Sequence, residues 1–128
     1  MRHLLDTHVG LPIFNQQTER LPKSVRDLLE AEDGDFFISV ASLWEIAIKV
    51  RLGKLDLAVE LRALPVSCRR FGIGLLPISA AHALCELEVS PPTRDPFDRL
   101  LLAQCQCDGL RLVTLDRALA GHPLAARL

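Results

Sequence analysis

Short apolar runs alternate along this chain with segments whose apolar residues recur every three or four positions. The short runs predict buried strands at residues 4–5, 36–38, 75–78 and 112–114. The three- to four-residue spacing predicts helices at about 11–17, 23–31, 43–52, 57–70, 80–87 and 96–108, with a short last helix starting at Asp116. Strands therefore alternate with helices along the whole sequence.

This alternation is typical of an α/β fold, in which helices cover both faces of a mostly parallel sheet. We expect a central sheet of four to five strands. The sequence contains no internal repeat, low-complexity segment or linker. We therefore expect residues 1–128 to form a single domain, a length that is sufficient for a sizeable core.

The composition shows a high proportion of apolar residues for a protein of this size. Hydrophobic residues make up 49% of the 128 residues, and the mean hydropathy is +0.22. No apolar run approaches the ~20 residues that span a membrane, and the first residues turn acidic at Asp6 before a signal-peptide core could form. We expect a cytoplasmic protein whose surplus apolar residues lie in the core or in an interface with another protein.

The cysteines give no sign of a zinc site or a disulfide framework. Cys68, Cys85, Cys105 and Cys107 lack a C-x-x-C or His-rich spacing. We expect reduced, mostly buried thiols.

The single tryptophan, Trp44, is expected in the core or in a protein interface rather than on a surface that stacks nucleic-acid bases.

Four acids, Asp6, Glu45, Asp98 and Asp116, each follow a predicted strand or lie near the start of the next helix. Each also has a purely structural interpretation. Asp6 and Asp116 are plausible helix N-caps, and Ser42 with Glu45 matches the S-x-x-E capping box. Asp95, Pro96 and Asp98 match an N-cap, a proline at the first helical position and an acid at the third. Taken singly, these acids are explained by capping.

Topology brings the four acids together. In an open parallel sheet, ligands bind outside the carboxyl ends of the strands, where the strand order switches, and this strand assignment places all four acids at that edge. Several close carboxylates repel each other unless a cation neutralises them, and oxygen ligands suit Mg²⁺ or Mn²⁺. Such an ion supports phosphodiester cleavage. The pattern predicts a metal-dependent nuclease site, with Lys49, Arg51, Arg94 and Arg99 as candidates for holding phosphates beside the acidic pocket. Each of these basic residues is equally well explained as part of a solvated helix face.

At these residues the sequence resembles the PIN-domain family, and within it the VapC-type toxins of toxin–antitoxin modules. The matching stretches are Leu4-Leu5-Asp6-Thr7-His8, Ser42-Leu43-Trp44-Glu45-Ile46-Ala47-Ile48-Lys49, Arg94-Asp95-Pro96-Phe97-Asp98-Arg99-Leu100-Leu101 and Leu112-Val113-Thr114-Leu115-Asp116. They occur in the family's order and span nearly the whole chain. The resemblance implies a PIN fold, a Mg²⁺- or Mn²⁺-dependent endoribonuclease, a cognate VapB-type antitoxin and a homodimer.

Carried over by position, Asp6, Glu45, Asp98 and Asp116 match the family's four acids in order. The resemblance implies Asp6 and Asp98 as direct metal ligands, with Glu45 and Asp116 completing the shell through water or positioning the attacking water. Thr114 matches a hydroxyl that could orient this water, and Asp95 is expected to cap the helix that presents Asp98. The chain departs from the family at Gly10 and Pro12, where similar toxins tend to have bulky apolar residues.

Two other functions remain compatible with the sequence. One is a non-catalytic interaction module that kept the fold, with its acids serving only as helix caps. The other is a metal-dependent phosphatase or phosphotransferase of similar topology that acts on small molecules. Cleavage of RNA that depends on a divalent ion would separate the nuclease from both.

Overall fold

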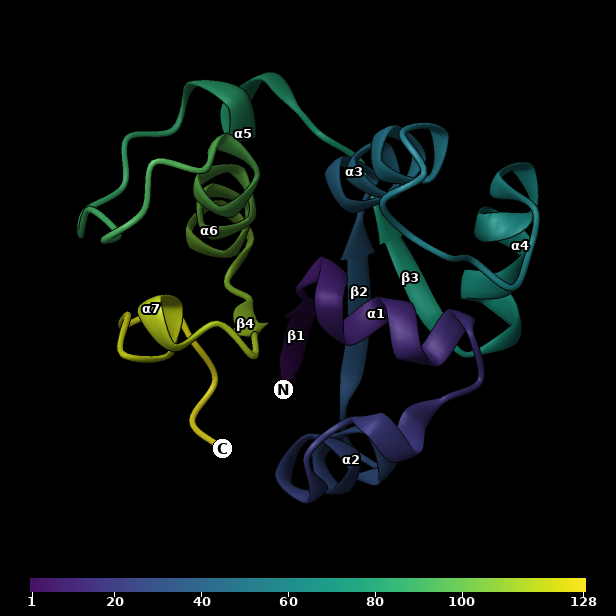
Figure 1. Ribbon diagram of the computed structural model, residues 1–128. Coiled ribbons are helices and arrows are strands. Elements are labelled where there is room, and N and C mark those ends of the chain that lie inside the picture. Colours follow the sequence, from purple (N-terminus) through teal and green to yellow (C-terminus); the bar gives the residue numbers. More distant parts are fainter.

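A computed structural model, which describes residues 1–128, has a parallel four-stranded sheet at its centre in the order β3-β2-β1-β4 (Figure 1). The strands are β1 (Arg2–Leu5), β2 (Asp35–Ser39), β3 (Ile73–Leu76) and β4 (Arg111–Val113). The helices are α1 (Thr7–Phe14), α2 (Lys23–Glu30), α3 (Val40–Arg51), α4 (Leu64–Arg70), α5 (Ala80–Leu84), α6 (Pro96–Asp108) and α7 (Arg117–Ala120), with short 3-10 helices η1 (Thr18–Arg20) and η2 (Leu61–Ala63). The predicted α/β class and the parallel sheet are confirmed.

Both faces of the sheet are buried, and each face has its own hydrophobic core. Helices α1 to α4 pack on one face, against Leu5 of β1 and Ile38 of β2. Helices α6 and α7 pack on the other face, against Leu4 and Leu112. Neighbouring residues in a strand point to opposite faces, so Leu4 and Leu5 serve different cores. This explains why the strands read as continuous apolar runs rather than as alternating patterns.

The first helix begins four residues earlier than predicted, at Thr7 instead of Leu11. The prediction was wrong because Asp6 ends β1 and caps α1 at once, so no loop separates the two elements. Pro12 lies inside α1, where its missing N–H leaves the carbonyl group of the exposed His8 free to bind water. Gly10 allows α1 to lie close to the sheet, since a Cβ atom there would come within 2.7 Å of Ile38 Cδ1.

The middle of the chain also differs from the prediction in three places. The predicted helix 57–70 is helical only from η2 onwards, and Pro65 lies in the first turn of α4. The predicted strand 75–78 lies two residues earlier, because Gly72, with a φ of +71°, turns the chain and Pro77 has no N–H for a further ladder bond. The predicted helix 80–87 ends at Leu84. These are errors of boundary, and the order of elements is as predicted.

Trp44 is 62% exposed, so of its two predicted positions the core is wrong, and a protein interface stays a prediction. The four cysteines are all free, as predicted; Cys68 and Cys105 are buried, whereas Cys107 is exposed. No helix of the chain combines the length and the apolar character needed to cross a membrane.

Candidate active site

The carboxyl ends of β1, β2 and β4 meet at one edge of the sheet because their registers align Leu5 with Ile38 and with Val113. The residues that follow these strands therefore emerge side by side. The strand order switches between β1 and β4, since the chain places β2 on one side of β1 and β4 on the other (Figure 1). A ligand site is expected at this switch.

Asp6 lies at the centre of this edge and is 5% exposed. Its Oδ1 accepts a hydrogen bond from the backbone N–H of Thr7 at 2.7 Å, which makes it the N-cap of α1. Its Oδ2 accepts a hydrogen bond from the Thr114 hydroxyl at 2.8 Å, across the switch in strand order. Burial raises the pKa of Asp6, and the nearby Glu45 carboxylate raises it further, against these two hydrogen bonds. The carboxylate is thus held rigidly in a position where its charge is costly.

Glu45 is not part of a capping box, so that interpretation was wrong. The N-cap of α3 is Ser39, whose hydroxyl oxygen accepts from the N–H of Ala41 at 3.0 Å. Ser42 and Glu45 therefore lie inside the helix, and their side chains point toward α1 instead of back to the helix start. Glu45 Oε1 accepts from the Thr7 hydroxyl at 2.7 Å, and Ser42 Oγ lies 2.9 Å from the same hydroxyl. Glu45 is buried beside Asp6 for reasons other than helix capping.

Asp95 and Asp98 have different environments although they begin the same helix. Asp95 is the N-cap of α6: its Oδ1 accepts from the N–H of Phe97 at 2.9 Å, and Pro96 follows at the first helical position. Asp98 caps nothing, and its only hydrogen-bond partner is the Thr93 hydroxyl, at a long 3.4 Å. Its pKa is raised to about 6 by burial first, and then by the charges of Asp95, Asp6 and Asp116. Asp98 is therefore the acid whose position the fold does not require.

Asp116 is the N-cap of α7, as predicted, and accepts from the N–H of Ala118 at 2.9 Å. Its own N–H donates to Thr114 Oγ1 at 3.1 Å. Thr114 therefore links two of the acids, since its hydroxyl donates to Asp6 and accepts from the backbone of Asp116. The same geometry recurs at α6, where the N–H of Asp95 donates to Thr93 Oγ1 at 3.1 Å.

The structure brings Asp6, Asp98 and Asp116 close enough to raise the pKa of Asp98, and Glu45 close enough to raise that of Asp6. As they stand, no three acidic, histidine or cysteine side chains converge into a ready set of metal ligands. The donor chemistry nevertheless suits a hard cation, because all the candidate donor groups are carboxylates. A divalent cation would also neutralise the negative charge that makes these carboxylates repel each other.

The four candidate phosphate-binding residues are not equivalent. Lys49 Nζ is paired with Glu45 Oε2 at 2.9 Å. Arg51 is the last residue of α3, about two turns away from Glu45 along the helix. Arg94 and Arg99 line a hollow of about 530 Å³ together with Thr93, whose hydroxyl contacts Asp98. Arg94 and Arg99 are thus the two candidates that form no ion pair and lie near Thr93, the residue that contacts Asp98.

Three hydroxyl residues of the site, Thr7, Ser42 and Thr93, were not predicted to have roles there. Thr7 donates to the Glu45 carboxylate, Ser42 contacts the Thr7 hydroxyl, and Thr93 contacts Asp98. The sequence carried one usable signal: Thr93 stands two residues before Asp95, just as Thr114 stands two residues before Asp116. A hydroxyl at that spacing accepts the backbone N–H of the capping acid.

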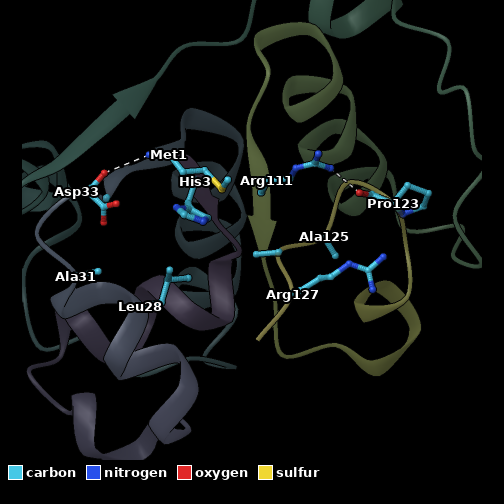
Figure 2. Close-up of a pocket in the computed structure, with 11 residues that line it drawn as sticks. Met1, His3, Leu28, Ala31, Asp33, Arg111, Pro123, Ala125 and Arg127 are labelled. Carbon is cyan, nitrogen blue, oxygen red and sulfur yellow. Dashed lines mark hydrogen bonds between the residues drawn. The ribbon is translucent and has the colours of Figure 1, made fainter.

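A separate hollow of about 580 Å³ lies at the opposite edge of the sheet, near the amino ends of β1 and β4 (Figure 2). It is lined by His3, Arg111 and Arg127 among others, and by none of the predicted site residues. His3 stacks on Phe36 with ring centroids 5.4 Å apart, and its buried Nδ1 has no hydrogen-bond partner. This hollow is not part of the carboxylate cluster.

We expect the charge of Asp98 to destabilise the ion-free protein as the pH rises. Its folded-state pKa of about 6 lies above the usual value of about 4, so the folded protein binds more protons than the unfolded chain between these values. Stability should fall across this interval and level off above pH 6. The full shift corresponds to about 3 kcal/mol, which solvent screening of the partly exposed side chain reduces to about 1–2 kcal/mol.

Urea unfolding in the presence of a chelator measures this effect by comparison with Asp98→Asn, whose side chain resembles the protonated acid. The asparagine variant should match the wild type near pH 4 and become the more stable protein above pH 6. A difference between the two that does not change over this interval would contradict the assigned environment of Asp98.

Comparison with known proteins gives a consistent assignment. The family model of the PIN domain matches residues 3–122. Ribonuclease VapC22 of Mycobacterium tuberculosis (strain ATCC 25618 / H37Rv) is 32% identical over 123 residues, which are 93% of this chain and 90% of that protein. The crystal structure of VapBC2 from Rickettsia felis bound to a DNA fragment from their promoter contains a chain that is similar to this one, with a TM-score of 0.61 and 14% sequence identity. The alignment covers 98% of this chain and 96% of that chain, and it supports the fold. The chain therefore belongs to the PIN domain family, as a relative of the VapC proteins.

Proposed function

We propose that this protein is a VapC-type endoribonuclease, which hydrolyses RNA phosphodiester bonds with a divalent metal ion and acts as the toxin of a toxin–antitoxin pair. The relative VapC22 is named a ribonuclease and aligns over 93% of the chain. A nuclease also suits the carboxylates at the switch in strand order, with two unpaired arginines near the start of α6.

The observation that carries this proposal is the environment of Asp98. Asp6, Asp95 and Asp116 cap helices, and Glu45 is held by Thr7 and Lys49. Asp98 has no such role, yet burial and then the neighbouring like charges raise its pKa to about 6. A carboxylate kept in an unfavourable position without a structural reason indicates function. The interpretation of the acids as caps alone does not account for it.

We further propose that the ion is Mg²⁺ or Mn²⁺, held directly by Asp6 and Asp98. Asp116 and Glu45 would complete the shell through water. When bound there, a divalent ion activates water as a nucleophile and neutralises charge on the phosphodiester.

The side chains around the acids have distinct roles in this proposal. Thr114 fixes the orientation of Asp6, and Thr7 fixes that of Glu45. Lys49 holds the other oxygen of the Glu45 carboxylate, since its ammonium group lies 2.9 Å from Oε2. Arg94 and Arg99 bind the phosphates that flank the cleaved bond. Arg51 lies too far along α3 to share this role.

We also propose that the protein works as one domain of residues 1–128, in the cytoplasm, as a homodimer that a VapB-type antitoxin inhibits. All four strands, and all the helices except α5 and η1, contribute residues to the site or to the two cores that support it. The solved structure that shares this fold is named as a VapBC complex. Exposed apolar side chains such as Val66, Phe71 and Leu84 offer contact area for such partners.

Incubation of the purified chain with structured RNA tests the activity. We expect cleavage in Mg²⁺ or Mn²⁺, its loss on addition of a chelator, and its recovery when the ion is restored. The phosphatase alternative predicts instead that p-nitrophenyl phosphate is hydrolysed and RNA is not. The interaction module predicts neither reaction, and toxicity on expression that required all four acids would exclude it.

A further inference from the structure

Trp44 occupies a position that neither core explains. It lies in α3 directly before Glu45, is 62% exposed and is the only tryptophan in the chain. Its ring makes an edge contact with the ring of Phe97, with centroids 5.9 Å apart and planes at 67°. Phe97 lies in the first turn of α6 directly before Asp98. An aromatic pair thus joins the two helices that carry two of the acids.

The pair is anchored on one side and open on the other. The backbone N–H of Phe97 is bonded to the side chain of Asp95, which fixes Phe97 at the start of α6. Phe97 is partly buried and supports the edge of the indole, whereas most of the Trp44 surface remains in contact with solvent. Aromatic pairs in this edge-to-face arrangement are stable, and the pair leaves the outer face of the indole free. A large flat apolar surface is thereby held beside the carboxylates.

We propose that Trp44, supported by Phe97, stacks an unpaired RNA base next to the carboxylate cluster and so positions the strand for cleavage; this inference rests on the ribonuclease function proposed above. Aromatic side chains stack any base through its π-face and need no hydrogen bonds to do so. Arg94 and Arg99, at the start of the same helix α6, are placed to hold the phosphates of that strand. Stacking requires a base that is not already paired, so the platform selects single-stranded segments.

RNA is favoured over a protein as the occupant because of what lies beside the indole. Glu45 and Asp98 are the sequence neighbours of Trp44 and Phe97, and they must remain open to a phosphodiester during turnover. A second copy of the chain seated on Trp44 would cover that approach permanently, whereas an inhibiting antitoxin would cover it only in the inactive complex. Val40, one turn earlier on α3, is 36% exposed, so a second copy of the chain is the competing occupant.

The fluorescence of Trp44 reports directly on the platform, because the chain has one tryptophan and no tyrosine. The Asp98→Asn protein in Mg²⁺, which should bind RNA without cleaving it, is titrated with single-stranded oligoadenylate and with an RNA duplex of equal length. We expect saturable quenching by the single strand and little change with the duplex. Quenching that depends on protein concentration and not on RNA would assign the indole to a protein interface and overturn the proposal.

Substitutions on α3 complete the test with fluorescein-labelled oligoadenylate and with cleavage kinetics. Trp44→Leu should weaken binding about tenfold and raise KM more than it lowers kcat, and Trp44→Phe should recover most of the loss. Leu52→Ala is the matched control, since Leu52 is 63% exposed at the other end of α3 and should leave both values unchanged.

The possible outcomes separate the two proposals. If the wild-type protein cleaves RNA and Trp44→Leu binds and cleaves it as well as the wild type does, the platform is wrong and the ribonuclease function stands. If the wild-type protein neither binds nor cleaves RNA, the ribonuclease function fails and the platform fails with it.

Discussion

Asp98→Asn should abolish RNA cleavage, with a fall in kcat of about 10³-fold or more and no loss of fold. An amide has nearly the shape of the carboxylate but binds a hard cation poorly, so the ion and its several kcal/mol of transition-state stabilisation are lost. No backbone group depends on Asp98 for capping, so the helix should be unaffected. Single-turnover cleavage of RNA in Mg²⁺ measures the first effect, and thermal unfolding in chelator measures the second.

Asp95→Asn is the matched control, because it changes an acid three residues away on the same helix. Asparagine is as good an N-cap as aspartate, so stability should change little. Activity should remain within a few-fold of the wild type, since Asp95 acts on the site only through its charge. If Asp95→Asn inactivates the protein and Asp98→Asn does not, the two roles have been assigned in reverse.

Thr114→Val should lower activity by about 10- to 100-fold, the usual cost of removing a group that orients a metal ligand. Valine preserves the shape of threonine but not its hydroxyl, so Asp6 Oδ2 loses its donor and the N–H of Asp116 loses its acceptor. Both acids then become less well fixed. Thr114→Ser keeps the hydroxyl and should keep most of the activity.

The diagnostic measurement for Thr114 is the dependence of cleavage on Mg²⁺ concentration. A positioning role predicts that Thr114→Val needs more Mg²⁺ for half-maximal activity, whereas Thr114→Ser keeps the wild-type requirement. If the valine variant is less stable but has an unchanged Mg²⁺ requirement, the positioning role is wrong and Thr114 has only a structural role.

The sequence was sufficient to predict the order of elements and the edge where the acids meet. Short apolar runs such as 36–38 are strong signals because both faces of the sheet are buried. Capping signals were equally clear at α6, where Asp95, Pro96 and Gly109 mark both ends. Gly109 has a φ of +69°, the left-handed conformation that ends a helix at little cost for glycine.

Local sequence patterns did not predict the side-chain positions that are determined by tertiary contacts. Ser42 and Glu45 have the spacing of a capping box, but Ser39 lies closer to the end of β2 and takes the cap. The side chains of Ser42 and Glu45 are then bound by Thr7, which is 35 and 38 residues distant in sequence. No pattern within one helix could indicate such a partner. The same holds for Trp44, whose exposed position depends on how α3 and α6 pack against each other.

The bond between Asp6 and Thr114 joins residues 108 positions apart and has a consequence for synthesis of the protein. A nascent chain that has left the ribosome only as far as α3 contains Asp6 and Glu45, but not the helix that presents Asp98 or the strand that holds Asp6 in place. The carboxylate cluster can form only when β4 pairs with β1. Any activity that depends on this cluster therefore requires synthesis of the chain at least as far as β4.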